Sequence, residues 1–184
     1  MTDAALVVAL ANAQADRRPS HARHVLAHDV LADVAGANAV LEPFLDGPLD
    51  ARELRQVRAL QRAVVTIAAA VIDGSPPPVD ALNALAAREP VILALEPHGD
   101  GLRTAVHATG AANIAKLVAT VMDELSELEP SRLRRCARPE CELVFYDTSR
   151  SGTQRWHAER PCGLRERQRR RRTQRPAGEV PAGG

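Results

Sequence analysis

Residues 136–175 read CARPECELVFYDTSRSGTQRWHAERPCGLRERQRRRRTQR, and this stretch decides how the C-terminal part of the chain folds. Four residues separate Cys136 from Cys141, fifteen more lead to His157, and another four lead to Cys162. Three thiolates and one imidazole make a complete tetrahedral ligand set for zinc. Because four protein ligands leave no coordination position open, the spacing predicts one structural zinc ion, Zn2+, rather than a catalytic one.

The small apolar content of residues 131–175 also favours a metal site. Three of the four Phe, Tyr and Trp residues of the chain lie between the ligands: Phe145, Tyr146 and Trp156. Such a segment would not overcome its chain entropy unaided, whereas zinc binding supplies roughly 10–16 kcal/mol to small fingers. We therefore expect a zinc finger here, with a β-hairpin between the ligand pairs and a helix after them. The alternative, unrelated buried or reactive side chains, is disfavoured because all the cysteines lie within 27 residues.

The net charge of +1 conceals a strong asymmetry between two parts of the chain. Residues 1–130 carry ten Lys or Arg and seventeen Asp or Glu, whereas residues 131–175 carry fourteen Arg and five acidic residues. The basic part points to a polyanionic partner, because the guanidinium group fits phosphate with two hydrogen bonds. The arginines expected to contact nucleic acid are Arg155, Arg165, Arg167, Arg169, Arg170, Arg171, Arg172 and Arg175.

Two alternatives to DNA binding follow from the same charges. RNA offers the same phosphates as duplex DNA, and phosphate contacts position a protein without specifying a base sequence. The basic helix could instead dock on the acidic residues 1–130, while zinc organises a surface for a protein partner.

The same residues resemble the CGNR-type zinc finger. That family shows two closely spaced cysteines, an F-x-D-x-S segment, an arginine before a tryptophan, and a last cysteine that begins Cys-Gly-Asn-Arg. The matching positions are Cys136, Cys141, Phe145, Asp147, Ser149, Arg155, Trp156, Cys162, Gly163 and Arg165. Two positions depart from the pattern, since His157 stands where the family has cysteine and Leu164 replaces the asparagine.

The resemblance also carries an expectation about function. In that family the preceding domain, called ABATE, is associated with stress-induced transcription regulators, and residues 1–130 are similar to it in length and layout. The resemblance implies a DNA-binding transcription regulator with the finger as reader and the preceding domain for sensing or oligomerisation. The further partners that it leaves open are a second copy of the chain, in a homodimer, and an unidentified small-molecule effector at residues 1–130.

Residues 1–130 themselves indicate a mainly helical domain with one β-hairpin, which makes the whole chain α+β. The clearest helix spans residues 50–73, where Asp50 is a good N-cap and Glu53 completes a capping box. Apolar residues recur on it at spacings of three and four and predict one buried stripe: Leu54, Val57, Leu60, Val64, Ile67 and Val71. Four arginines lie off that stripe and are expected in solvent: Arg52, Arg55, Arg58 and Arg62.

Glycine and proline divide the rest of this part into further elements. We expect a helix over residues 4–15, where a strand is the alternative, and a second helix over 21–35 that Gly36 ends. A third follows over 79–88, and a fourth begins after Gly110. Strands over residues 91–96 and 101–108 are joined by a turn at 97–100. Residues 176–184 have the composition of a disordered tail.

Other features bound the class of protein. His21, His24 and His28 lie at helical spacing, but surface histidines explain them as well as a second metal site does. No phosphate-binding loop, nucleophile elbow or metalloprotease motif occurs, so we expect no enzymatic activity. The chain lacks a signal-peptide pattern and a long apolar run, so we expect a cytoplasmic protein with reduced thiols and no membrane partner. Heavy use of Ala and Arg beside a single lysine, Lys116, is typical of a GC-rich bacterial genome.

Overall fold

The structure is a computed structural model and describes residues 4–13, 29–88, 91–108, 111–139, 141 and 143–174. Three features singled out above lie outside the described residues: the His21, His24 and His28 group, Arg175, and the tail over 176–184. Most of the helix expected over residues 21–35 lies outside them too.

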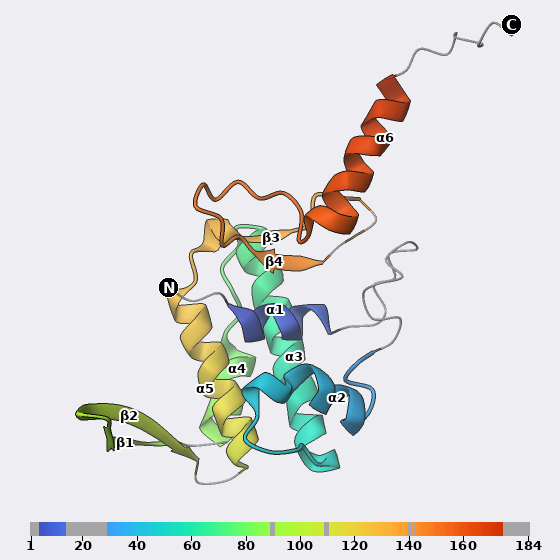
Figure 1. Ribbon diagram of the computed structural model, residues 1–184. Helices are drawn as coiled ribbons and strands as arrows, with labels where there is room; N and C mark the ends of the chain where they lie inside the picture. Colours follow the sequence, from blue (N-terminus) through green and yellow to red (C-terminus); the bar gives the residue numbers. More distant parts are fainter. Residues whose placement is uncertain are drawn as a thin grey trace, which may run out of the picture.

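A long helix, α3 (Ala51–Ile72), forms the centre of the molecule, as the capping box predicted (Figure 1). The Asp50 carboxylate accepts hydrogen bonds from the backbone N–H groups of Arg52 and Glu53, and the Glu53 carboxylate accepts one from the Asp50 N–H. These bonds satisfy N–H groups that a helix start would otherwise leave open. The predicted stripe is buried from Leu54 to Ile67.

One of the four arginines on α3 does not lie in solvent as expected. Arg58 is half-buried, and its guanidinium donates to the backbone carbonyls of Leu31, at 2.6 Å, and Ala32, at 2.8 Å. The spacing of residues along the helix could not predict these hydrogen bonds, because the two acceptors lie in a turn that is distant in the sequence. Arg52, Arg55 and Arg62 are exposed.

Four shorter helices pack around α3: α1 (Ala5–Asn12), α2 (Val34–Leu41), α4 (Asp80–Arg88) and α5 (Ala112–Glu127). The core between them is built from leucine, valine, isoleucine and alanine side chains, in keeping with the scarcity of aromatic residues. The buried Glu124 of α5 accepts hydrogen bonds from the Leu6 and Val7 N–H groups at 3.0 and 2.8 Å. A carboxylate at the positive end of a helix stabilises it, so this contact favours a helix over a strand for residues 5–12.

Gly36 lies inside a helix and does not end one, which corrects the prediction made for it. The helix α2 begins after Asp33, whose carboxylate accepts a hydrogen bond from the Gly36 N–H at 2.7 Å. A β-carbon at Gly36 would lie 2.4 Å from the carbonyl oxygen of Val30. The glycine is therefore required by a close backbone approach, which a sequence alone does not reveal.

Strands β1 (Val91–His98) and β2 (Gly101–Ala108) form an antiparallel hairpin. The second strand has the predicted bounds, but β1 runs two residues further than predicted. Only Gly99 and Asp100 therefore remain in the loop, and Gly99 takes a φ of 58°. The hairpin projects from the helical body, which it contacts where β2 meets α5 (Figure 1).

The C-terminal part contains a second small sheet, formed by β3 (Leu133–Arg135) and β4 (Val144–Tyr146). Its pairing differs from the hairpin expected between the ligand pairs, because the partner of residues 144–146 lies before Cys136. Short helical turns η1 (Glu42–Phe44), η2 (Pro130–Arg132) and η3 (Glu159–Gly163) precede or join the main elements, and α6 (Leu164–Gln174) follows η3.

The second sheet packs on the helical body. Leu133 and Val144 are buried against Ala68 of α3. The side-chain amide of Asn12 donates to the Val144 carbonyl at 2.8 Å and accepts from the Val144 N–H at 2.9 Å, as a neighbouring strand would. The described helices include none that is both long and apolar enough to cross a membrane.

Candidate metal centre and basic helix

The four predicted zinc ligands meet at one point. One ligand atom each from Cys136, Cys141, His157 and Cys162 lies within 4.8 Å of every other. The Nδ1 atom of His157 is 3.2 Å from the Cys141 sulfur and 3.6 Å from the Cys162 sulfur. Bonds of about 2.0–2.3 Å from a tetrahedral zinc ion require separations of this size. The residues therefore fit one structural zinc ion, with His157 in place of the cysteine usual in the resembled family.

Short-range backbone geometry brings the ligands together. Cys136 directly follows β3, and its N–H donates to the Leu143 carbonyl at 2.8 Å. The Cys141 N–H donates to the Arg138 carbonyl at 2.9 Å, which closes a tight turn between the first two cysteines. Cys162 lies in η3, two residues before α6 begins. All three thiols are buried.

The thiol pKa values show why this cluster calls for a cation. A hydrogen bond from Cys141 lowers the pKa of the Cys136 thiol to about 3. That same bond, together with burial, raises the pKa of Cys141 well above its usual range. Burial also raises the pKa of Cys162. One thiolate is thus favoured and two more are opposed by repulsion and desolvation, which a divalent cation would reverse.

Trp156 covers the metal centre. Its ring packs against the cysteine cluster, together with Leu143. The guanidinium of Arg155 lies over the ring, 5.6 Å from its centre, in a cation–π contact. Arg155 is thus fixed beside the metal centre, where the family resemblance expected an arginine before the tryptophan.

Asp147 organises the loop between β4 and His157. It is fully buried, and its carboxylate accepts hydrogen bonds from the Ser149 N–H, the Ser149 hydroxyl and the Gln154 N–H. Burial acts to raise the pKa of Asp147, but these hydrogen bonds and the Arg134 charge outweigh it, so the pKa is lowered. The F-x-D-x-S residues therefore fold the loop and are not exposed for a ligand.

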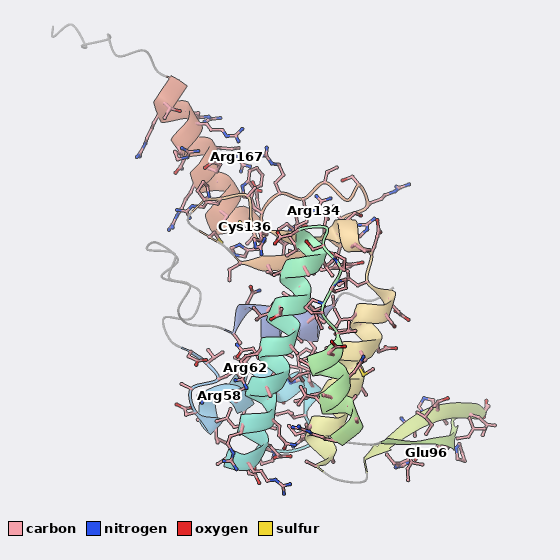
Figure 2. All side chains as sticks on the ribbon, turned by 180° about the vertical axis from the view of Figure 1, so that it is seen from behind. Arg58, Arg62, Glu96, Arg134, Cys136 and Arg167 are labelled. Atoms are coloured by element: carbon pink, nitrogen blue, oxygen red, sulfur yellow. The ribbon has the colours of Figure 1, made fainter. Side chains whose placement is uncertain are left out.

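Two arginines of the finger have a structural role that the sequence did not reveal. Arg132 donates to the carbonyls of Asp147 and Ser149, at 2.9 and 2.8 Å. Arg134 donates to the carbonyls of Gly152 and Gln154, at 2.8 and 3.2 Å, and its position near Cys136 is visible in Figure 2. By composition they are indistinguishable from the arginines of α6, so only the fold separates them.

The helix α6 extends away from the helical body (Figure 1). The docking of this helix on the acidic residues 1–130, considered above from charge, is therefore not the arrangement adopted. The helix carries six arginines and one glutamate. Among the described residues it packs against η3, which holds Cys162.

Acidic residues within the finger already engage part of the basic helix. The buried Glu166 forms ion pairs with Arg169, at 2.8 Å, and Arg170, at 3.2 Å. The hydrogen bonds from Arg169 and Arg170 lower the pKa of Glu166 to about 2. Glu159 pairs with Arg167, and a β-carbon at Gly163 would lie 2.4 Å from the Glu159 carboxylate. Gly163 thus leaves room for that carboxylate.

The remaining predicted contact residues of α6 lie at its surface. Arg165, Arg171 and Arg172 are exposed, and the last two lie in the final turns, furthest from the metal centre. Leu164, which replaces the asparagine of the resembled motif, begins the helix and is 42% exposed.

Comparison with known families agrees with this layout. The CGNR zinc finger family matches residues 132–175. The ABATE family, described as "Putative stress-induced transcription regulator", matches residues 4–138, which is most of the chain. The two matches overlap at β3, the strand that joins the finger to the helical body. No curated protein was found to match.

Proposed function

The chain belongs to the ABATE family and carries a CGNR zinc finger, and from this premise we propose that it is a zinc-dependent DNA-binding transcription regulator. The observation that carries the proposal is the position of Cys162. This residue is both a zinc ligand and part of the turn that begins α6. Zinc would therefore fix the direction in which a strongly basic helix leaves the protein.

The chemistry of α6 supports phosphate as its counterpart. A helix that is polar all round has no apolar face to bury against its own protein. The arginines of α6 are exposed and available to a partner. Arg171 and Arg172 are exposed at its outer end. The pairs with Glu159 and Glu166 hold other arginines in fixed positions, from which phosphate oxygens can compete for them. Duplex DNA is the partner we propose, because the ABATE family is described as a transcription regulator and duplex DNA offers a regular array of phosphates.

The zinc ion in this proposal has no catalytic role. Four protein ligands complete its coordination, and no open position remains for a substrate. We propose a non-enzymatic protein of the bacterial cytoplasm, where thiols stay reduced and available to zinc.

A small-molecule effector, if the protein has one, would fit between α3 and α4. A pocket of about 460 Å3 there is lined mainly by alanines and other small or apolar side chains, and three charged residues also line it: Arg62, Asp80 and Arg88. Pockets of this size hold small ligands. We propose this pocket as the effector site of the ABATE region.

Fluorescence anisotropy on labelled duplex DNA tests the DNA-binding proposal. If about six phosphates are contacted, the logarithm of the binding constant should fall with the logarithm of salt concentration at a slope near −5. Replacing Arg171 and Arg172 with glutamine should reduce this slope by about 2. The matched control replaces Arg52 and Arg55 of α3, which are also exposed, and should leave binding unchanged.

Two results would contradict the proposal. Binding by the zinc-loaded protein that is undetectable or independent of salt would refute it, and a zinc-organised surface for a protein partner would then be preferred. Structured RNA that competes better than duplex DNA would place the protein among RNA-binding proteins instead.

A further inference from the structure

The β1–β2 hairpin exposes an apolar face that neither the zinc centre nor the basic helix uses. Successive residues of a strand point to opposite faces, and residues paired across strands share a face. Leu93, Leu95 and Pro97 of β1 therefore share one face with Leu102 and Thr104 of β2. The three leucines are 67%, 66% and 66% exposed, which is unusual for side chains of this size.

The opposite face of the hairpin holds its charges. Glu96 pairs with Arg103 at 3.0 Å and with His107 at 2.9 Å. Glu96 is labelled in Figure 2, on the hairpin and far from the labelled arginines of the finger. The charged groups thus satisfy one another on one face, and the leucine face among the described side chains carries no charge at all.

The hairpin needs a covering partner for physical reasons. An isolated two-stranded hairpin is marginally stable in water and gains independent stability by packing against another element. Here the body contacts it where β2 meets α5, which leaves the leucine face open. Burying this face would stabilise the hairpin as well as the contact.

We propose that the leucine face of the β1–β2 hairpin is a homodimer interface, at which two hairpins pack face to face about a twofold axis. A twofold interface requires a surface that complements itself. An uncharged leucine face meets this condition, because apolar groups oppose apolar groups and the Glu96, Arg103 and His107 network points outward on both copies. A polar or charged partner would require matching groups on this face, and the described side chains offer only the Thr104 hydroxyl.

The exposed apolar area and the shape of the molecule also support a second copy of the chain as the partner. The three leucines expose together roughly 350–400 Å2, the size of the largest apolar patch on a typical monomer. Two copies, with Pro97 and Thr104 at the margins, would bury roughly 1,000 Å2, about the minimum for a biological interface and in the range of weak, reversible association. The hairpin and α6 lie at opposite ends of the molecule (Figure 1), so two bodies can meet through hairpins and keep both basic helices accessible.

Sedimentation velocity of the full-length, zinc-loaded protein over a wide concentration range tests the proposal. We expect a reversible monomer–dimer equilibrium. Replacing Leu93 and Leu102 with threonine, which keeps the preference for strand, should raise the dimer dissociation constant about 100-fold or more. The matched control is Ile92→Thr, since Ile92 is 58% exposed but lies on the opposite face, and it should change the constant by less than about threefold.

Several results would overturn the proposal. It fails if the unmodified protein is monomeric at every concentration, or if the double variant dimerises as well as the unmodified protein. Equal effects of the double variant and of Ile92→Thr would exclude the leucine face as the contact. Hydrogen exchange on the unmodified chain gives a test that needs no variant. Amide protection over residues 91–108 should rise with protein concentration, and unchanged protection between the monomeric and dimeric ranges would also refute the interface.

Discussion

The helical body and the zinc finger are stabilised in opposite ways. The body, residues 4–128, buries a continuous core of leucine, valine, isoleucine and alanine, with Glu124 and Asp50 satisfying helix ends. The finger buries few apolar side chains beyond its cysteines, and its loop is held by the Asp147 carboxylate and by Arg132 and Arg134. Apolar burial is enough for one region, whereas the other depends on directional polar bonds and a metal. The two should therefore respond differently to the same perturbation.

Removal of zinc should have the largest effect, and it should be confined to the finger. Chelation removes a binding free energy of roughly 10–16 kcal/mol that keeps this region folded, and the substitution Cys162→Ser removes one of the four ligands on which that binding depends. We expect residues 136–143 and 147–174 to lose amide protection in hydrogen exchange while α3 and α5 keep theirs. The β3–β4 sheet should keep part of its protection, because Leu133 and Val144 pack on the body. Loss of helical structure across the whole chain would show that the two regions fold as one unit.

A cavity in the core of the helical body should destabilise the body and leave the zinc finger intact, and the effect should be smaller than that of zinc removal. Leu60 is fully buried in the core, so Leu60→Ala should lower the free energy of unfolding of the helical body by about 2–5 kcal/mol. Urea denaturation followed by circular dichroism measures this change. Zinc content should remain at one ion per chain, and a loss of zinc would contradict the separation of the two regions.

Loss of the Asp147 carboxylate should weaken the finger without touching a metal ligand. Asp147→Asn replaces an acceptor of three hydrogen bonds with an amide that cannot accept them all, at a cost of about 1–3 kcal/mol. We expect faster zinc release to a chelator, measured by competition. Asp73→Asn is the control, because Asp73 forms an exposed ion pair with Arg135 outside the loop, and its effect should stay within about 0.5 kcal/mol.

The smallest effect is expected at Glu166. Glu166→Gln removes one negative charge and the ion pairs to Arg169 and Arg170, so the carboxylate no longer competes with phosphate for these two guanidinium groups. We expect DNA affinity at low salt to rise about threefold, with a steeper salt dependence. The pKa of Glu166 is lowered from 4.5 to about 2. Its carboxylate is therefore fully charged above pH 4.5, and the ion pairs are lost only as the pH falls toward 2. The difference between the variant and the unmodified protein should accordingly stay constant between pH 6 and pH 8. Unchanged or weaker DNA binding by the variant would contradict the role given to these pairs.

Local signals in the sequence located the elements and the ligands that depend on neighbours along the chain. The spacing of Cys136, Cys141, His157 and Cys162 was sufficient for the metal centre, and the Asp50–Glu53 capping box was sufficient for α3. The capping box acts over a few neighbouring residues. The metal centre is recognisable because a cluster of cysteines and a histidine has few other uses in a protein.

The features that the sequence did not predict depend on contacts between distant residues. Gly36 faces the Val30 carbonyl, and Arg58 reaches the carbonyls of another turn. The partner of β4 lies before Cys136, where Leu133 packs with Val144 against Ala68 of α3. In the same way, Arg132 and Arg134 differ from Arg171 and Arg172 only in which carbonyls happen to lie near them.

The amide of Asn12, which occupies the place of a neighbouring strand beside Val144, has a practical consequence for anyone who wishes to study the zinc finger alone. A fragment cut at residue 130 would leave that strand edge bare and uncover Leu133 and Val144, two features that promote aggregation. Insolubility of such a truncated finger would therefore say nothing about its capacity to bind DNA. A chimera that retains α1 and α3, or an Asn12-bearing peptide supplied in trans, would be the fairer starting material.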